Sequence, residues 1–472
     1  MDEKRDRMGS RLGFILISAG CAIGLGNLWR FPYLAGDNGG AIFVLFYLVF
    51  VIVLGVPVMT AEFAVGRGSQ KSVARSFHVL QPKGTKWHIF SWFAVLGNYA
   101  LMFFYTCITG WMFNYIFKMA SGSFNAQLSA VTREGFFEVG LNNFLGMLGS
   151  PGQQIGFTLL ICVLGFGVCA LGLRNGVERV GKILMAGLFC ILVIIAIRSV
   201  TLPGAGAGLA FYLIPNPAAI AEHGLGNVLY AAMGQAFFSL SLGMGSMAIF
   251  GSYIDKERKL TGEAVTVSFL DTAAALLAGF AIFPAVFAFG AEPGQGAGLV
   301  FMTMPGVLHQ MPGGTQLWGT LFFILFSAAA FTTIIAVYEN LVAFLIDLIG
   351  CSRQKSVLIN AVVVFLVCLT TALSFNMWSE PIGKVLGAMK IGGDMSDFWD
   401  FIVSQNILPI GSAIYILFCM TTKGWGYKNF LEETDSGTGI MWPQKLKGYF
   451  TFAMPAIIAI VFIMGYIEKF GK

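Results

Sequence analysis

The residues best suited to binding a ligand lie in an apolar stretch near the start, SAGCAIGLGNLWRFP at 18–32. Three glycines, an amide and a full charge interrupt it: Gly20, Gly24, Gly26, Asn27 and Arg30. In hydrocarbon each unpaired backbone polar group costs several kcal/mol, so a helix is broken at membrane depth only where the break is buried in protein or lines a cavity. We therefore expect this break to be a binding site.

A second break of the same kind lies in GQAFFSLSLGMGSMAIFGSY at 234–253, where Ser239, Ser241, Gly243 and Gly245 interrupt the apolar run. Two Gly-interrupted segments in corresponding positions of two halves indicate the midplane site of a transporter. The alternative for either break alone is ordinary helix packing, because small residues spaced as Gly-x-x-x-Gly also line membrane helix interfaces.

Ionisable side chains in the apolar segments form a second set of candidates. Each costs about 2.5–3.5 kcal/mol at the centre of a membrane helix on insertion scales, so each is a functional hypothesis. Five stand out: Arg30, Glu62, Asp271, Glu339 and Asp397. Asn27, Thr332 and Thr333 add uncharged oxygen ligands, and no His or Cys cluster accompanies them. A ligand set of hard oxygens suits alkali or alkaline-earth cations and excludes soft metals.

The alternative is that these groups pair with one another to hold helices together. We expect this of Glu62, because a carboxylate near a broken helix can accept its free N–H groups. It fits Asp271 less well, because the span at 262–290 contains no basic residue.

The candidate residues lie on predicted membrane helices. Of the 472 residues, 57% are hydrophobic and 11% charged, whereas soluble domains have about 25% charged residues. Runs of about 20 apolar residues, enough to cross a bilayer, predict eleven spans at 11–36, 41–66, 89–119, 154–172, 178–198, 225–254, 262–290, 316–348, 356–375, 397–420 and 446–467. We expect an all-α polytopic membrane protein, a single transmembrane domain over 1–472. Its two inverted repeats would cover about 11–198 and 225–420, with an additional helix at 446–467.

The distribution of charge predicts the orientation. With the N-terminus inside, inner segments hold 21 of the 29 Lys and Arg residues, in line with the positive-inside rule. We therefore expect a cytoplasmic N-terminus and an extracytoplasmic C-terminus in the inner (plasma) membrane. The net charge of +5 follows from this topology rather than from a nucleic-acid partner.

The eight cysteines show no CxxC spacing, so they indicate neither a disulfide framework nor a zinc site.

Four motifs together resemble one family: GLGNLWRFP at 24–32, NGG at 38–40, GQAFFSLSLGMG at 234–245 and DFW at 397–399. They are similar to the neurotransmitter:sodium symporters, especially the bacterial amino acid transporters with eleven spans. The resemblance covers about residues 10–467. It implies a sodium-coupled secondary transporter that imports a neutral amino acid by alternating access, with helices one and six broken.

The resemblance also implies two sodium sites. The first would use the Ala22 carbonyl, the side chains of Asn27, Ser239 and Asp271, and the substrate carboxylate. The second would use the carbonyls of Gly20, Ile23 and Ala329 and the hydroxyls of Thr332 and Thr333.

The resemblance places the substrate between the two breaks. Its carboxylate would meet the N–H groups of Leu25 and Gly26 and the hydroxyl of Tyr105. Its ammonium group would meet the carbonyls of Ala22, Phe238 and Ser239 and the hydroxyl of Ser241. Its side chain would lie among Cys21, Leu101, Phe238, Met244, Thr333 and Val337. This lining has no charge and includes an adaptable methionine, which favours an apolar or aromatic amino acid. A transporter of GABA or a betaine-like zwitterion is the alternative.

The resemblance also implies an outer gate, an inner gate and a prediction about whether transport needs chloride. The outer gate would be Arg30 with Asp397 above the Phe238 lid, and the inner gate Arg5 with Asp347, supported by Tyr253. Animal relatives generally need chloride, whereas Asp271 would supply a fixed negative charge at the first sodium site. We therefore expect chloride-independent transport. Ala186-Gly187 stands where relatives usually have a proline in span five, and Gly187 would supply a weaker break.

Missing motifs argue against an enzyme, and one assay separates a transporter from a channel. The chain has no GxSxG, HExxH, Walker A or His-rich motif, so we expect no enzyme. A ligand-gated channel or a sensor is the other alternative, because ion sites and a pocket serve those as well. A flux assay separates them, since a channel passes ions without substrate. The expected partners are the amino acid and membrane lipid, with no obligatory protein partner.

Overall fold

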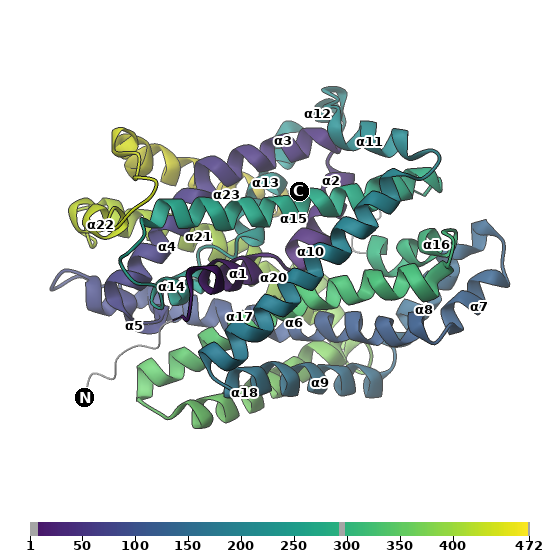
Figure 1. Ribbon diagram of the computed structural model, residues 1–472, viewed down its shortest axis with the longest axis horizontal. Coiled ribbons are helices and arrows are strands. Elements are labelled where there is room, and N and C mark those ends of the chain that lie inside the picture. The colour runs from purple at the N-terminus through teal and green to yellow at the C-terminus, as the bar shows by residue number, and fades with distance from the viewer. Residues whose placement is uncertain (1–7, 292–297, 471–472) are drawn as a thin grey trace.

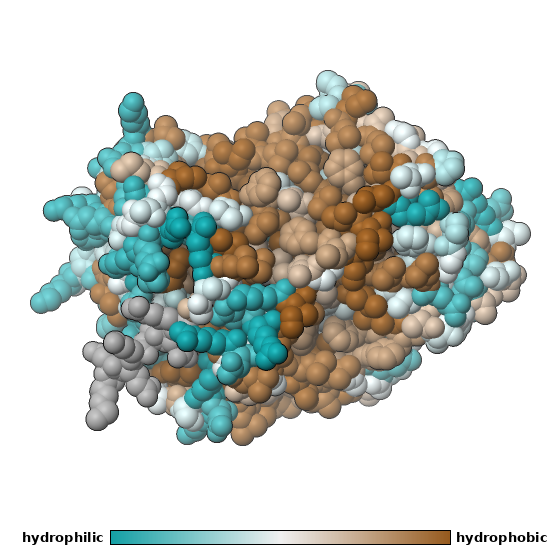
Figure 2. Space-filling model, in the orientation of Figure 1, coloured by the Kyte–Doolittle hydropathy of each residue, from teal (hydrophilic) through white to brown (hydrophobic). Residues whose placement is uncertain are grey.

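The computed structural model describes residues 8–291 and 298–470, and this part of the chain is built from helices. Its only β-bridge pairs Arg258 with Thr438 within the described ranges. Long helices run side by side along the long axis, and short helices lie at both ends (Figure 1). Hydrophobic residues form a broad central band between two hydrophilic ends (Figure 2). This is the surface pattern of a multi-pass membrane protein.

The first half of the chain begins with a bent helix pair. It contains, in order, α1 (Arg11–Ala22), η1 (Gly26–Arg30), α2 (Phe31–Asp37), α3 (Ala41–Phe50), η2 (Val51–Gly55), α4 (Val56–Ser69), α5 (Val73–Leu80), α6 (Ile89–Ala120), α7 (Ser123–Ser129), η3 (Arg133–Gly135), α8 (Phe136–Leu148), α9 (Pro151–Ala170), η4 (Leu173–Glu178) and α10 (Arg179–Val200).

The second half begins with two short connecting helices. It contains α11 (Ala205–Leu213), α12 (Ala218–His223), α13 (Leu225–Ser239), α14 (Ser246–Gly251), α15 (Leu260–Ala288), η5 (Leu299–Thr303), α16 (Met304–His309), η6 (Thr315–Gly319), α17 (Thr320–Ile349), α18 (Arg353–Ser374), α19 (Ser379–Ala388), α20 (Met395–Ile402), η7 (Val403–Ile407), α21 (Leu408–Met420), α22 (Tyr427–Thr434), η8 (Gln444–Leu446), η9 (Tyr449–Ala453) and α23 (Met454–Phe470).

The described residues contain nine helices long and apolar enough to cross a membrane, or ten if the bent pair Arg11–Ala22 and Gly26–Asp37 is one span. The prediction of an all-helical membrane protein is thus confirmed. The predicted span at 225–254 is not one continuous helix, because α13 ends at Ser239 and α14 begins at Ser246. The count of eleven and the inverted repeat stay predictions.

Both predicted breaks occur. The first pair bends by 51° between Ala22 and Gly26. In the second, Gly243 (φ 89°) and Gly245 (φ 75°) adopt left-handed backbone that a glycine accepts without steric cost. The helix is broken here because these residues leave the α-helical region.

Glu62 of α4 caps the half-helix that follows the second break. Its carboxylate accepts hydrogen bonds from the backbone N–H groups of Gly243 at 2.6 Å and Met247 at 3.1 Å. The Asn98 side chain donates to the Met244 carbonyl at 2.8 Å. The predicted role of Glu62 is confirmed: it satisfies N–H groups that the broken helix leaves free.

The expected break at Gly187 is absent. Residues Arg179–Val200 form one continuous helix, α10. A β-carbon at Gly187 would have no neighbour within 4 Å. A glycine without proline costs a helix only about 1 kcal/mol against alanine, which the surrounding turns of α10 tolerate.

Candidate functional site

The residues predicted for the first sodium site meet at the first break. Asn27 of η1 donates through Nδ2 to Ser239 Oγ at 3.0 Å and to Asp271 Oδ1 at 2.8 Å. Ser239 Oγ in turn donates to Asp271 Oδ2 at 2.7 Å. All three side chains are fully buried. Three elements distant in sequence, η1, α13 and α15, thereby bring an amide, a hydroxyl and a carboxylate together.

Two further polar residues belong to this cluster and were missed by the sequence analysis. The Tyr47 hydroxyl of α3 lies 3.5 Å from Asp271 Oδ2 and 3.4 Å from Ser239 Oγ. Gln235 of α13 donates to the Gly26 carbonyl at 2.7 Å, which ties the two broken segments together. Tyr47 carried no signal in the sequence, because it lies in the apolar run AIFVLFYLVF and looks like a packing residue. Gln235 lies in the motif at 234–245 and could have been found as a polar residue in an apolar run.

The residues predicted for the second sodium site also converge. The Thr332 hydroxyl lies 2.8 Å from the Ala329 carbonyl and 3.5 Å from the Ile23 carbonyl. The Thr333 hydroxyl lies 3.4 Å from the Gly20 carbonyl. Five oxygens from α17 and the unwound end of α1 therefore face one another.

Both clusters fit a hard cation. Within the described ranges no group of three or more His, Cys, Asp or Glu side chains could hold a metal ion. The available ligand atoms are instead carbonyl, hydroxyl and carboxylate oxygens, the types that bind alkali cations rather than soft metals. Asp271 is the one acidic side chain in the two clusters.

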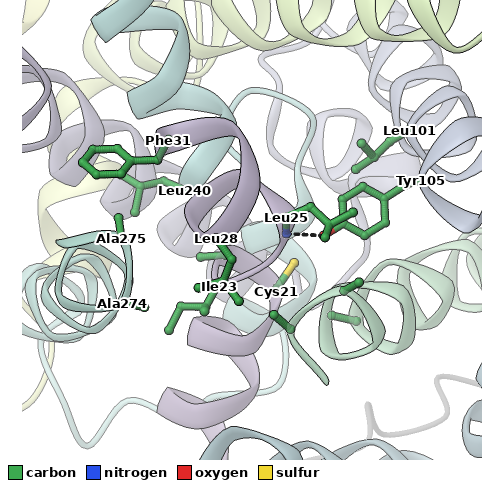
Figure 3. Close-up of a cluster of buried hydrophobic side chains, with 14 of the residues drawn as sticks. Cys21, Ile23, Leu25, Leu28, Phe31, Leu101, Tyr105, Leu240, Ala274 and Ala275 are labelled. Carbon is green, nitrogen blue, oxygen red and sulfur yellow. Dashed lines mark hydrogen bonds between the residues drawn. The ribbon is translucent and has the colours of Figure 1, made fainter. Parts of the chain in front are cut away.

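A small closed cavity lies between the two breaks. Its volume is about 10 Å³, about the room one water molecule needs. The Tyr105 hydroxyl accepts a hydrogen bond from the Leu25 N–H at 2.8 Å on its wall, with the Cys21 sulfur directed toward this pair (Figure 3). The lining residues are Cys21, Ala22, Gly24, Gly26, Leu101, Tyr105, Phe238, Ser241, Met244, Thr333, Val403 and Leu408.

The cavity agrees with most of the predicted pocket. Val337 is fully buried but does not line the cavity. Val403 of η7 and Leu408 of α21 line it instead and were missed. Ser241 donates to the Cys21 carbonyl at 3.2 Å, so the polar end of the cavity touches both breaks. An amino acid side chain enters only if the walls separate.

A second cavity of about 160 Å³ adjoins the first, with Phe238 lining both. The Arg30 guanidinium lies 4.4 Å from the centre of the Phe238 ring. Arg30 and Asp397 both line this cavity, but they form no ion pair within 4 Å among the described residues. Asp397 instead accepts the Gly393 N–H at 2.8 Å. Their pairing as an outer gate stays a prediction.

The predicted inner gate is described only in part. Arg5 lies outside the described residues. Asp347 accepts the Ser72 N–H at 2.7 Å. The Tyr253 hydroxyl donates to Glu339 Oε1 at 3.2 Å.

Glu339 is the clearest case of pairing among the buried ionisable residues. Its carboxylate is ion-paired with the Arg353 guanidinium of α18, with 3.0 Å between Nη1 and Oε1. The Glu339 side chain is 1% exposed. This pair joins α17 to α18 and holds the helices together, as the alternative reading of the ionisable residues expects.

Comparison with known proteins agrees with this geometry. The sequence model of the Sodium:neurotransmitter symporter family matches residues 5–132 and 120–469. The chain is 33% identical over 476 residues to an uncharacterized sodium-dependent transporter of Haemophilus influenzae, covering 98% of each. It is 26% identical over 515 residues to the sodium- and chloride-dependent GABA transporter 2 of Bos taurus, covering 98% of this chain and 80% of that one.

A solved structure is similar throughout. The crystal structure of MhsT in complex with L-phenylalanine has 38% sequence identity and a TM-score of 0.84, covering 98% of this chain and 99% of that one. These relatives are transporters, not enzymes. The chain therefore belongs to the sodium:neurotransmitter symporter family and is a sodium-dependent, multi-pass membrane symporter.

Proposed function

We propose that the chain imports a neutral apolar or aromatic L-amino acid together with sodium, without chloride, by alternating access. The observation that carries the proposal is the presence of two oxygen clusters beside one uncharged cavity, which Thr333 of the second cluster lines. Eleven spans, two inverted repeats and a cytoplasmic N-terminus complete the proposed architecture. The positions of the two breaks, one at the start of each proposed repeat, support the repeats, and the distribution of Lys and Arg supports the orientation.

The backbone at the first break would bind the amino acid's carboxylate. The N–H groups of Leu25 and Gly26 lie at the start of a helical segment, where the helix dipole favours an anion. The Tyr105 hydroxyl already accepts the Leu25 N–H and can donate its own proton to a carboxylate oxygen. Carbonyls freed at the breaks would bind the ammonium group, because such carbonyls attract cations in transporters with broken helices.

Sodium bound at each cluster would supply a positive charge and connect residues from different helices. At the second cluster, an ion bound by carbonyls of α1 and hydroxyls of α17 would tie the inner half of the bent span to α17. At the first cluster, Asp271 contributes a negative charge that balances the bound cation. This fixed charge supports chloride independence.

The chemistry of the cavity wall supports the substrate class. Cys21, Leu101, Met244, Val403 and Leu408 present no charge to the side chain. MhsT, whose crystal structure contains L-phenylalanine, supports an aromatic substrate. The similarity to a GABA transporter keeps a different small zwitterion as the second candidate.

Uptake into proteoliposomes driven by a sodium gradient tests the proposal. We expect uptake of labelled L-phenylalanine that stops when sodium is replaced by potassium and continues when chloride is replaced by gluconate. Competition by each of the twenty amino acids and GABA would rank the substrates. Failure of leucine, tyrosine and tryptophan to compete would contradict the pocket assignment, and ion flux without substrate would favour a channel.

A further inference from the structure

The inner end of α1 is held by a carboxylate from span five. Glu178, the last residue of η4, accepts the Gly9 N–H through Oε2 at 3.0 Å. Its Oε1 lies 3.4 Å from the Ser10 hydroxyl and 2.7 Å from Lys182 Nζ. The Glu178 side chain is only 6% exposed. One buried carboxylate therefore fastens the residues just before α1 to the start of span five.

The contact is close enough to restrict the sequence of α1. A β-carbon at Gly13 would lie 2.1 Å from Glu178 Oε1. The Ser10 hydroxyl caps α1 by accepting the Gly13 N–H at 3.1 Å. A negative charge beside the first turn of a helix is also favoured by the helix dipole. The Ser10 cap, Gly13 and the Glu178 carboxylate therefore pack against one another at the start of α1.

Arg11, in the first turn of α1, forms a second contact with a neighbouring helix, and this contact is more exposed to solvent. Arg11 Nε lies 2.9 Å from Glu263 Oε1 at the start of α15, and the Arg11 side chain is 49% exposed. An ion pair with one partner in solvent is weak. Glu178 is therefore the stronger of the two ties between α1 and its neighbours.

The same helix carries part of the second sodium cluster. Gly20 lies in α1 and Ile23 caps it, and their carbonyls face Thr333 and Thr332. A helix of 12 residues moves as a stiff rod about 18 Å long. Movement at its inner end must therefore displace the carbonyls at its other end.

We propose that Glu178 is a positioning residue that latches the inner end of α1 through Gly9 and Ser10, and that opening of this latch releases the second sodium cluster. The inference rests on the proposed function, because it assigns a residue to the inward-opening step of sodium-coupled transport. Glu178 would hold α1 from the side of span five, in addition to the predicted inner gate at Asp347.

Hydrogen–deuterium exchange of the full-length protein tests the latch without any transport assay. Glu178→Gln keeps the size of the side chain but removes its charge. Lys182, whose side chain is 34% exposed, keeps its contact with the Ser10 hydroxyl at 3.2 Å. The matched control is Glu432→Gln, on an exposed carboxylate of α22.

We expect amides of α1 to exchange roughly tenfold faster in Glu178→Gln, the change expected when a hydrogen bond to a charged acceptor becomes one to a neutral acceptor. Adding 200 mM sodium should slow them again, and Glu178→Asp should lie between the two. Unchanged exchange in α1, or faster exchange spread equally over all helices, would overturn the latch.

The sodium dependence of uptake provides the second readout. Glu178→Gln should raise the sodium concentration for half-maximal L-phenylalanine uptake by roughly the same factor, with a smaller change in the maximal rate. An unchanged sodium requirement would overturn the link to the second cluster. Lack of sodium-driven uptake by the wild type would contradict the proposed function instead, and the exchange experiment would still decide the latch.

Discussion

A single methyl group at Gly24 should disable the site. A β-carbon there would lie 2.3 Å from the Tyr105 hydroxyl and 2.5 Å from Thr333 Oγ1, whereas ordinary contact begins at 3.4 Å. Both oxygens must therefore retreat by about 1 Å. The Tyr105 hydroxyl would move away from the Leu25 N–H, and the Thr333 hydroxyl from the Gly20 carbonyl.

The expected cost follows from the hydrogen bond that the displaced Tyr105 hydroxyl would donate to the substrate carboxylate. Losing a hydrogen bond to a charged group costs about 1.5–3 kcal/mol, which weakens amino acid binding about 10- to 150-fold. The apparent sodium affinity should fall as well, because Thr333 belongs to the second cluster.

Calorimetric binding of L-phenylalanine in 200 mM sodium measures both effects for Gly24→Ala. Gly167→Ala in α9 is the matched control, because a β-carbon at Gly167 has no neighbour within 4 Å. Melting temperatures of both variants show whether the proteins are folded. If Gly24→Ala bound L-phenylalanine within twofold of the wild type, the assignment of this cavity to the substrate would be refuted.

Three further changes test other parts of the site. Asp271→Asn should lower sodium-driven uptake in chloride-free buffer and make it responsive to added chloride; equal uptake in both buffers, at the wild-type rate, would refute the role of its charge. Met244→Ala removes a large side chain from the cavity wall, so tryptophan should gain about tenfold over leucine in uptake competition, whereas an unchanged ranking would place the side chain elsewhere. Burial and the nearby Asp397 raise the pKa of Asp394, the N-cap of α20, to about 6. Because this folded-state pKa exceeds the unfolded value of 3.8, stability against thermal unfolding should fall as the pH rises from about 4 to about 6. In Asp394→Asn, which keeps a capping oxygen, that dependence should vanish, and an identical slope in both proteins would assign it to another group.

Glu62 shows what could be predicted about the site. It is the one acidic residue in its predicted span, and a carboxylate near a broken helix can accept hydrogen bonds from the N–H groups that the break leaves free. The structure places those N–H groups at Gly243 and Met247. The prediction succeeded because a break leaves unpaired backbone groups wherever it lies, and a buried carboxylate needs donors.

Tyr47 and Val337 show where such reasoning stops. Tyr47 lies among apolar residues of α3, and only the packing of α3 and α13 beside α15 brings its hydroxyl to Asp271. Val337 belongs to α17, as Thr333 does, but it lies one turn further along and does not line the cavity. The wall there comes from Val403 and Leu408 of a distant span.

Residue patterns were enough to predict the helical membrane class, the two breaks and the oxygen chemistry of the ligands. These depend on local properties: the length of apolar runs, glycines that end a helix, and the types of polar side chains left within the runs. Which groups meet could be read only from the packing of the helices. It joins Asn27 to Ser239 and Asp271, closes the cavity with Val403 and Leu408, and fastens α1 to Glu178. Such contacts depend on the rotation and depth of each helix against its neighbours, which are set by packing across residues far apart in the chain.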